Sequence, residues 1–389
     1  MKSINRRSAL KAGAALAGCG AFSGLGRAAE PFNFALAVEA AGSAAVQGGT
    51  TAGLAIAVVR KGQTVASQGF GLANLETRTP ATADSIFRIA SVTKTFTSAA
   101  IMQLVEQGRL GLEHTLDKFY PDIPNAASVT IQQLLSHTSG IHDFVNGGLP
   151  ADALAWKTPD EIAGGVARMQ PLFDFDAGTH FSYSNSGYIL LGGILEKVSG
   201  KSYDDYLADG IFKPLGMDRT AVDHLEDVVV GRADGYAKIG SGFRHADHSG
   251  LPHAAGAIRS TASDLALWCT AFFDGKVVTF KSVQLMTKPA RTRSGAKVGE
   301  AHWWPQGFHP RNPPPFVQNS NYGLGWELTT FYGRPAAGHS GGIAGFNSMI
   351  LRYLDEDLAL ILLANTENGI IAPWEKLIEA AGASKNQDA

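Results

Sequence analysis

The sequence predicts an α/β (α+β) fold in which a mostly antiparallel sheet is flanked by terminal helices and carries an inserted all-helical lobe. Strand-like patterns occur near both ends of the 389-residue chain, and amphipathic helical patterns fill its middle. A single sheet that contains both groups of strands leaves the fewest unpaired edges. With 45% apolar residues the chain can bury the cores of about two lobes, and we expect a cleft where they meet.

The first strands are predicted as a β-hairpin. Residues 54–59 and 64–70 have strand patterns, and the turn between them carries charge and a glycine. Further strands are expected at 322–330, 335–339, 346–353 and 358–364. Helices are expected from Ser91 to Gly108, at 131–136, 159–169, 188–198, 203–207 and 262–274, and from Trp374 onward.

These patterns predict three parts of the chain. Residues 1–28 form an export signal, residues 29–90 together with 255–389 form a discontinuous sheet lobe, and residues 91–254 form the helical lobe. Residues 291–321 fit no element and are long for an unstructured loop, so a functional lid and a disordered segment are both open.

The N-terminal segment has the features of a twin-arginine export signal. Arg6 and Arg7 precede a weakly apolar Ala/Gly/Leu stretch, and small residues follow around Ala28, after which we expect cleavage. Export to the periplasm or secretion follows from this interpretation. The alternative is a lipoprotein site at Leu16-Ala17-Gly18-Cys19, which would leave the protein tethered to a membrane through lipidated Cys19.

Charge and cysteine content exclude several other classes. Removal of residues 1–28 takes away five of the 33 basic residues and none of the 35 acidic ones, so the formal net charge changes from −2 to −7. A net charge of this sign disfavours nucleic-acid binding. Cys269 would be the remaining cysteine, which prevents an internal disulfide, and its helical context predicts a packed core thiol. The oligomeric state is left open.

Ser91 and Lys94 form the first candidate catalytic pair. Residues three apart share one face of a helix, so both side chains can point into one cleft. A lysine in a partly dry site can lose its proton near neutral pH and activate a serine hydroxyl. The same Ser-x-x-Lys spacing recurs at Ser8 and Ser294, but neither serine begins a helical pattern of the mature chain. A plain N-cap serine is the alternative for Ser91.

Tyr183-Ser184-Asn185 lies in a loop just before a helix that is expected to begin near Gly187. The Tyr183 phenol can share a proton with Ser91 and pass it to a leaving group. Asn185 offers an amide donor to a substrate carbonyl. An Asx-type turn with an exposed tyrosine is the structural alternative.

Gly338-His339-Ser340-Gly341-Gly342 ends a strand that is expected to face the cleft. Glycines let a substrate backbone approach, and a free strand edge can bind an extended acyl group. The backbone N–H groups of Ser91 and Gly342 can then form an oxyanion hole. A glycine-rich turn with a structural histidine is the alternative.

The three motifs in this order resemble the β-lactamase-related serine hydrolase superfamily, which holds class C β-lactamases, D-alanyl-D-alanine carboxypeptidases, D-aminopeptidases and serine esterases. The resemblance covers residues 54–365 and implies a β-lactamase/transpeptidase-like fold. It implies that Ser91 is the acylated nucleophile, that Lys94 and Tyr183 handle its proton, and that Asn185 orients the substrate. His339 stands where many relatives carry lysine, and Ser340 and Gly341 complete a substrate-binding motif. Which of Lys94 and Tyr183 is the base is left open.

Two departures narrow the expected substrates. His339-Ser340-Gly341 replaces the usual Lys-Thr-Gly of class C β-lactamases, and a largely neutral imidazole attracts a drug carboxylate less well. Carboxypeptidases of this type place a basic residue after Gly-x-Gly, whereas Trp326-Glu327 follows here and would repel a terminal carboxylate.

We therefore expect an exported, metal-independent ester or amide hydrolase. The alternatives are a D-Ala-D-Ala carboxypeptidase or D-aminopeptidase that acts on peptidoglycan peptides, and a penicillin-binding sensor that acylates without turnover.

No cofactor or metal is expected. The histidines and aspartate at 245, 247, 248 and 253 are interpreted as solvated loop residues, since no helix fixes their spacing. His137 is expected to have a structural role at the end of its helix, where it bonds to backbone. The sequence has neither a phosphate loop nor a dinucleotide fingerprint.

Overall fold

An eight-stranded antiparallel sheet forms the centre of the computed structural model, which describes residues 33–143, 158–224, 226–246, 253–302 and 317–385. The strand order is β3-β2-β1-β13-β12-β11-β10-β9. The strands are β1 (Gly53–Arg60), β2 (Gln63–Asn74), β3 (Thr79–Pro80), β9 (Val317–Tyr322), β10 (Glu327–Phe331), β11 (Arg334–Ile343), β12 (Phe346–Tyr353) and β13 (Leu358–Ala364). Because β1 pairs with β13, the sheet joins the two ends of the chain, and the predicted fold class is confirmed.

The predicted hairpin of β1 and β2 turns at Lys61 and Gly62. Both residues have positive φ, 52° and 70° respectively. Two successive left-handed residues give a tight turn whose twist matches that of the strands on either side. Glycine suits the second position because it has no Cβ.

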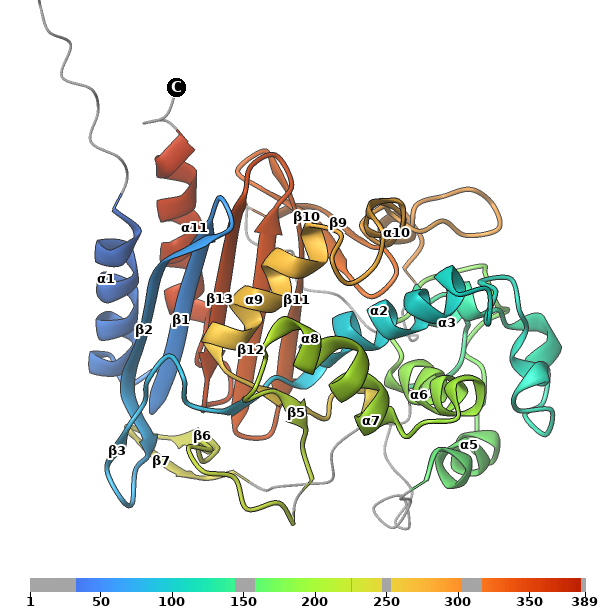
Figure 1. Cartoon of the computed structure of the whole chain (residues 1–389), viewed down its shortest axis with the longest axis horizontal. Coiled ribbons are helices and arrows are strands. Elements are labelled where there is room, and N and C mark those ends of the chain that lie inside the picture. Colours follow the sequence, from blue (N-terminus) through green and yellow to red (C-terminus); the bar gives the residue numbers. More distant parts are fainter. Residues whose placement is uncertain (1–32, 144–157, 225, 247–252, 303–316, 386–389) are drawn as a thin grey trace, which may run out of the picture.

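The two faces of the sheet are covered by different helices (Figure 1). Along β1, Leu54, Ile56 and Val58 pack with α1 (Phe34–Gln47) and α11 (Ile371–Lys385), whereas Ala55, Ala57 and Val59 belong to the core on the opposite face. α9 (Ala262–Phe273) covers that opposite face. Since both faces are covered, β13 is apolar and buried along its whole length.

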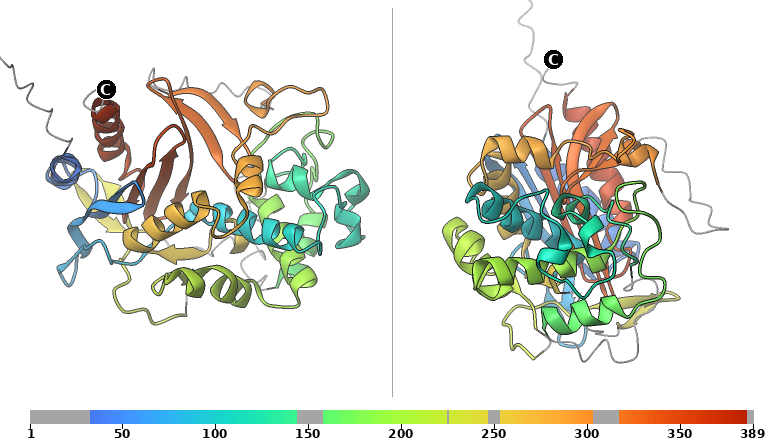
Figure 2. Two further views of the ribbon diagram at one scale, coloured as in Figure 1. Left: turned by 45° about the horizontal axis from the view of Figure 1, so that its top comes forward. Right: turned by 90° about the vertical axis from the view of Figure 1, so that its right-hand side faces the viewer.

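Helices gather beside the sheet, on the right of Figure 1 and at the right of the left panel of Figure 2. They are α2 (Thr93–Glu106), α3 (Ile131–Leu135), α5 (Pro159–Ala167), α6 (Asn185–Ser199) and α7 (Tyr203–Leu207), while α8 (Lys213–Leu215) contacts α9 nearer the centre of Figure 1. Short helical turns lie between them or nearby: η1 (Ala90–Val92), η2 (Leu116–Lys118), η3 (Ala126–Ser128), η5 (Ala208–Phe212), η6 (His253–Ala255) and η7 (Val298–Glu300). α10 (Phe280–Met286) follows α9.

Two small sheets connect the helices to the main sheet. One has the order β4-β8-β5, and the other is the hairpin of β6 and β7. Their strands are β4 (Phe87–Arg88), β5 (Ala221–Val222), β6 (Tyr236–Ile239), β7 (Gly242–His245) and β8 (Ile258–Ser260). The described part of residues 91–254 thus contains the short strands β5, β6 and β7 besides its helices. The lobe boundaries themselves stay a prediction.

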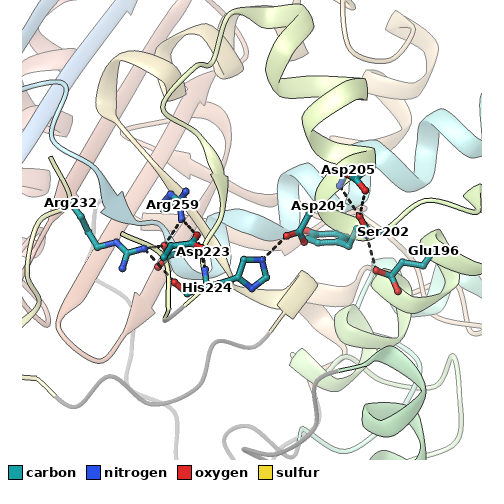
Figure 3. Close-up of polar contacts among 10 residues, drawn as sticks. Glu196, Ser202, Asp204, Asp205, Asp223, His224, Arg232 and Arg259 are labelled. Atoms are coloured by element: carbon teal, nitrogen blue, oxygen red, sulfur yellow. Dashed lines mark hydrogen bonds and ion pairs between the residues drawn. The ribbon is translucent and has the colours of Figure 1, made fainter. Parts of the chain in front are cut away.

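A buried carboxylate ties the first small sheet together (Figure 3). Asp223 accepts hydrogen bonds from Arg88 at 2.7 Å, from Arg259 at 2.8 Å and from Arg232, and its side chain has no exposed surface. Arg259 also bonds to Asp227 at 2.6 Å. Because Arg88 precedes η1 and Arg259 follows η6, this network joins the segment that carries Ser91 to the segment that contacts Lys94.

Several predicted boundaries were wrong. The expected strand at 322–330 is the end of β9, a turn and the start of β10, since Gly325 adopts a φ of 83° that interrupts any strand. α6 begins at Asn185, where the side chain of Ser184 caps it by accepting from the Gly187 N–H, and not near Gly187. α11 begins at Ile371.

Some predictions fall on residues that the structure does not describe. Cys19, Ala28 and the whole export segment lie outside the described residues, as do Asp247, His248 and part of the 291–321 segment. Within the described residues, no helix combines the length and the apolar character that crossing a bilayer requires.

Candidate active site

Ser91 lies in η1, directly before α2, and its side chain caps neither helix. The N-cap positions belong to Ile89 for η1 and Val92 for α2, and neither makes a side-chain cap bond. Ala90 has a φ of 45°, in the left-handed region that costs a non-glycine residue free energy. The N-cap explanation of Ser91 was therefore wrong, and its hydroxyl is left for other contacts.

Lys94 is one turn further along and is fully buried. Its Nζ lies 3.1 Å from Ser91 Oγ, 2.7 Å from Asn185 Oδ1 and 2.7 Å from the backbone oxygen of Ala255. Burial lowers the pKa of the amine to about 7, although the negative charges of Asp143 and Glu327 oppose that shift. Near neutral pH a large fraction of Lys94 is therefore uncharged.

The backbone oxygen of Ala255 is held in place by α2 itself. Thr97 Oγ1 donates to the oxygen of Ala254 at 2.7 Å, and the N–H of Ile258 donates to Thr93 Oγ1 at 3.1 Å. Both threonines lie on α2, so η6 and β8 are fixed to the helix that carries Lys94. Sequence reasoning missed this contact, because a backbone acceptor leaves no mark on residue type.

Tyr183 forms a hydrogen bond with Ser91, and Lys94 Nζ lies 4.7 Å from the centre of its ring. Burial raises the pKa of the phenol well above its usual value of 10, and the bond to Ser91 only partly opposes this. The phenol therefore keeps its proton at neutral pH. The prediction that Ser91, Lys94 and Tyr183 converge is confirmed in geometry, while their chemical roles stay predictions.

His137 positions Tyr183. Its ring lies 4.2 Å from the Tyr183 ring between centres, and its Nδ1 accepts the backbone N–H of Ser184 at 3.1 Å. Burial lowers the pKa of His137 well below its usual value, so the ring is neutral and can accept that bond. His137 does bond to backbone, as predicted, but in the Tyr183 loop and not in its own helix.

Asn185 connects Lys94 to Asp143. Its Oδ1 accepts from Lys94, and its Nδ2 donates to the two carboxylate oxygens of Asp143 at 3.3 and 3.1 Å. The predicted amide donor thus points to a carboxylate within the protein, and substrate binding by Asn185 stays a prediction. Asp143 was missed, although it is the first acidic residue after the helix predicted at 131–136.

His339 is buried on β11, where burial favours the uncharged form of its ring. Burial lowers the pKa of its ring, and its Nε2 lies 2.9 Å from the Tyr322 hydroxyl. Ser340 uses both its hydroxyl and its backbone N–H to donate to Glu327, at 2.8 and 3.2 Å. The expectation of an uncharged imidazole in the third motif agrees with this environment. Substrate contacts of both residues stay predictions.

Gly341 lets β11 approach the nucleophile. A Cβ at this position would lie 2.3 Å from the backbone oxygen of Ile89 and 3.1 Å from the backbone nitrogen of Ser91. Any side chain would therefore separate β11 from η1. β10 pairs with β11 only as far as Gly338, so the following residues extend beyond the end of their neighbour. This edge is where the predicted oxyanion donor Gly342 lies.

A cavity of about 570 Å³ opens beside these residues. Tyr183, Ser340 and Glu327 line the part next to the catalytic groups, and residues of β10, β12 and α11 line the rest. From the 291–321 segment, η7, His302 and the end of β9 contribute to its wall.

The remaining histidines and the cysteine have other surroundings. His245 pairs with Glu76 at 2.7 Å on the surface. His253, expected to be solvated, is instead partly buried in η6 against Tyr203, and desolvation of its ring lowers its pKa to about 4. Cys269 is buried as predicted, and burial raises its thiol pKa to about 12. In the described part of the chain, no three potential ligand side chains gather as a metal site would require.

Comparisons with known proteins agree with this geometry. The model of the family described as Beta-lactamase matches residues 38–372. Penicillin-binding protein 4* of Bacillus subtilis is 29% identical over 327 residues, which are 77% of this chain and 64% of that protein. A D-aminopeptidase of Gluconobacter oxydans is 25% identical over 355 residues, 90% of this chain and 62% of that protein. The chain therefore spans less than two thirds of the length of either curated relative.

A solved structure has the same arrangement of the chain. The D-amino acid amidase from Ochrobactrum anthropi SV3, in complex with L-phenylalanine, superimposes with a TM-score of 0.74 at 27% sequence identity. The match covers 90% of this chain and 98% of that one.

Proposed function

The chain belongs to the Beta-lactamase family of serine hydrolases, and on this premise we propose that it forms and hydrolyses an acyl-enzyme on an ester or amide. Ser91 Oγ attacks the substrate carbonyl, the leaving group departs with a proton, and water then releases the acyl group. The activity, substrates and partners of the whole protein are part of this proposal.

One observation carries the proposal: Lys94 has three polar neighbours in a dry site. An uncharged amine has two N–H donors and one lone pair. Asn185 Oδ1 and the backbone oxygen of Ala255 can only accept, so they take both N–H groups. The lone pair is then left for the hydroxyl proton of Ser91, 3.1 Å away between heavy atoms. A pKa of about 7 makes this form abundant at neutral pH.

The two pKa shifts favour Lys94 over Tyr183 as the general base. The phenol pKa is raised well above 10, whereas the amine pKa is lowered to about 7. Tyr183 thus starts as a proton donor to Ser91 Oγ. After the attack it is suited to give that proton to the leaving group and to regain one from protonated Lys94.

The developing oxyanion would be stabilised by backbone N–H groups. Ser91 and Gly342 supply them in this proposal, and the close approach that Gly341 permits supports a common target for both. Each such donor is worth about 3–4 kcal/mol in the transition state.

Active-site labelling tests the proposal. A fluorophosphonate should attach to Ser91 of the wild type, and Ser91→Ala should abolish both labelling and p-nitrophenyl ester hydrolysis. Ser43→Ala, on the outer side of α1, is the matched control and should keep both. Normal turnover by Ser91→Ala would refute the proposal.

A peptidase of D-amino-acid peptides is the second candidate, favoured by the similarity to a D-aminopeptidase. Turnover of D-Ala-terminated peptides and of D-amino acid amides, compared with p-nitrophenyl esters, separates the two. A penicillin-binding sensor would instead give a stable adduct at Ser91 in mass spectra, with no product release.

Export is a further part of the proposal. The Arg6-Arg7 pair and the small residues around Ala28 support it, with Cys19 as the alternative point of attachment. Replacing both arginines by lysine should retain the protein in the cytoplasm of the host. Mass spectrometry of the mature N-terminus distinguishes release at Ala29 from lipidation at Cys19.

A further inference from the structure

We infer that Glu327 binds a positively charged group of the substrate. This hydrolase should therefore prefer an acyl group that carries both a cation and apolar atoms. The inference deepens the proposed function and rests on it. It concerns the cavity of about 570 Å³ beside Tyr183 and Ser340.

The cavity wall is mostly apolar, and its charged residues are negative. Its apolar lining includes Phe181, Tyr322, Phe331, Met349 and Trp374. Among its lining residues within the described ranges, Glu327 and Glu375 are the charged ones, and none is lysine or arginine. His302 also lines it, and burial lowers the pKa of that ring. The cavity is therefore suited to apolar and cationic groups.

Glu327 is held in place by Ser340, and no lysine or arginine of the described residues forms an ion pair with its carboxylate. Ser340 donates to both carboxylate oxygens, which fixes the orientation of the side chain, and 37% of that side chain is exposed. In the described part of the chain its one possible ion-pair partner within 4.0 Å is His339 Nδ1, at 3.6 Å. His339 Nδ1 lies 2.6 Å from the backbone oxygen of Ser340, to which it donates, and burial lowers the pKa of the ring, so His339 is a poor cation for the carboxylate. A substrate ammonium group would supply one.

The carboxylate also lies close to the reacting groups. Its negative charge opposes the lowering of the Lys94 and His339 pKa values by burial. The same charge adds to the raising of the Tyr183 pKa. It bonds to Ser340, the neighbour of Gly341, and a Cβ on Gly341 would lie 3.1 Å from the Ser91 nitrogen. A cation on the acyl group of a substrate bound at Ser91 is thus within the field of Glu327. The same field repels substrates with a carboxylate at that position.

The test uses pairs of p-nitrophenyl esters with the same shape and different charge. One member carries a trimethylammonium group on its acyl chain, and the other carries the neutral tert-butyl isostere. Acyl chains of two lengths place the charged group at two distances from the ester carbonyl. The permanent charge removes any titration of the substrate, and assays on the pH plateau above the Lys94 pKa keep the base unprotonated. The cationic preference is the ratio of the two kcat/KM values.

Glu327→Gln should lower the cationic preference about tenfold for at least one chain length. Comparing ratios between variants cancels the different intrinsic reactivities of the esters. Glu379→Gln is the matched control, because it removes one negative charge from the exposed side of α11 outside the cavity wall, and it should keep the preference. A preference within about twofold of the wild type in Glu327→Gln, at both lengths, overturns the inference.

Wild-type measurements keep the inference testable if Glu327→Gln does not fold. Added salt should reduce the cationic preference, since a partly exposed carboxylate is screened. A preference that salt leaves unchanged would contradict a charge contact. Neutral-ester turnover and Ser91 labelling without any cationic preference would reject only this inference. If neither ester turnover nor Ser91 labelling were seen, the proposed function would be rejected as well.

Discussion

Asn185 Oδ1 accepts a hydrogen bond from Lys94 Nζ at 2.7 Å, and the amide of the same residue donates to Asp143. A carboxylate, an amide and an amine are thus connected in series behind Ser91. Asn185 is the first residue of α6 and is buried, so its amide group has little freedom to move. This connection fixes the direction of the Lys94 lone pair and links the Lys94 pKa to the charge of Asp143.

The activity should therefore depend on pH through Lys94. kcat/KM should rise with pH and level off above about 7, because the uncharged amine is the base. Asp143 raises the Lys94 pKa, so Asp143→Asn should move the rising limb to lower pH. Asp122→Asn, which removes an exposed carboxylate, should leave the limb in place. A limb that does not move in Asp143→Asn would contradict the coupling. Neutral-ester hydrolysis across the pH range measures it.

Gly341→Ala should destabilise the protein and abolish fluorophosphonate labelling. Its Cβ would lie 2.3 Å from both the oxygen of Ile89 and Ser348 Oγ, so β11 must move away from η1. Overpacking of this kind costs about 1–3 kcal/mol. Gly342→Ala is the control for stability, because its Cβ meets only Asn347 Nδ2, at 3.9 Å. Urea unfolding and labelling compare the two, and equal stabilities would show that β11 does not approach Ser91 so closely.

His137→Phe should reduce both stability and turnover. The new ring can still stack on Tyr183, but the buried N–H of Ser184 loses its acceptor. Leaving such a group unsatisfied costs about 1–3 kcal/mol. Loss of this bond should displace the loop that carries Tyr183 and so lower kcat about tenfold. His180→Phe, at an exposed position, provides the control. Unchanged kcat in His137→Phe would mean that the stacking alone positions Tyr183.

Asp223→Asn should be among the most destabilising single changes. It removes the buried charge that Arg88, Arg232 and Arg259 share, and breaking such a network costs about 3–5 kcal/mol. Asp209→Asn removes an exposed carboxylate between Lys201 and Lys213 and should have a much smaller effect. Equal urea midpoints for the two variants would show that the network does not support the segments around Ser91.

Local patterns determined the elements that carry the site. The hairpin at 61–62, the helix after Ser91 and the strands at 346–353 and 358–364 are encoded by neighbouring residues, through turn glycines and apolar periodicity. The three motifs could be found because each is short and their order is informative. The short strands β4 to β8 could not, because two to four residues carry no periodicity.

Contacts between distant segments were decided only by the tertiary structure. Lys94 donates a hydrogen bond to the backbone oxygen of Ala255, His137 supports Tyr183, and Ser340 bonds to Glu327. These contacts join residues that lie 13 to 161 positions apart. The sequence by itself pointed to Ser91, Lys94 and Tyr183, whereas the carboxylate of Asp143 and the backbone oxygen of Ala255 joined them only in the folded chain. Burial then decided which of them hold a proton, because the free energy of a charge depends on the solvent that the folded chain excludes.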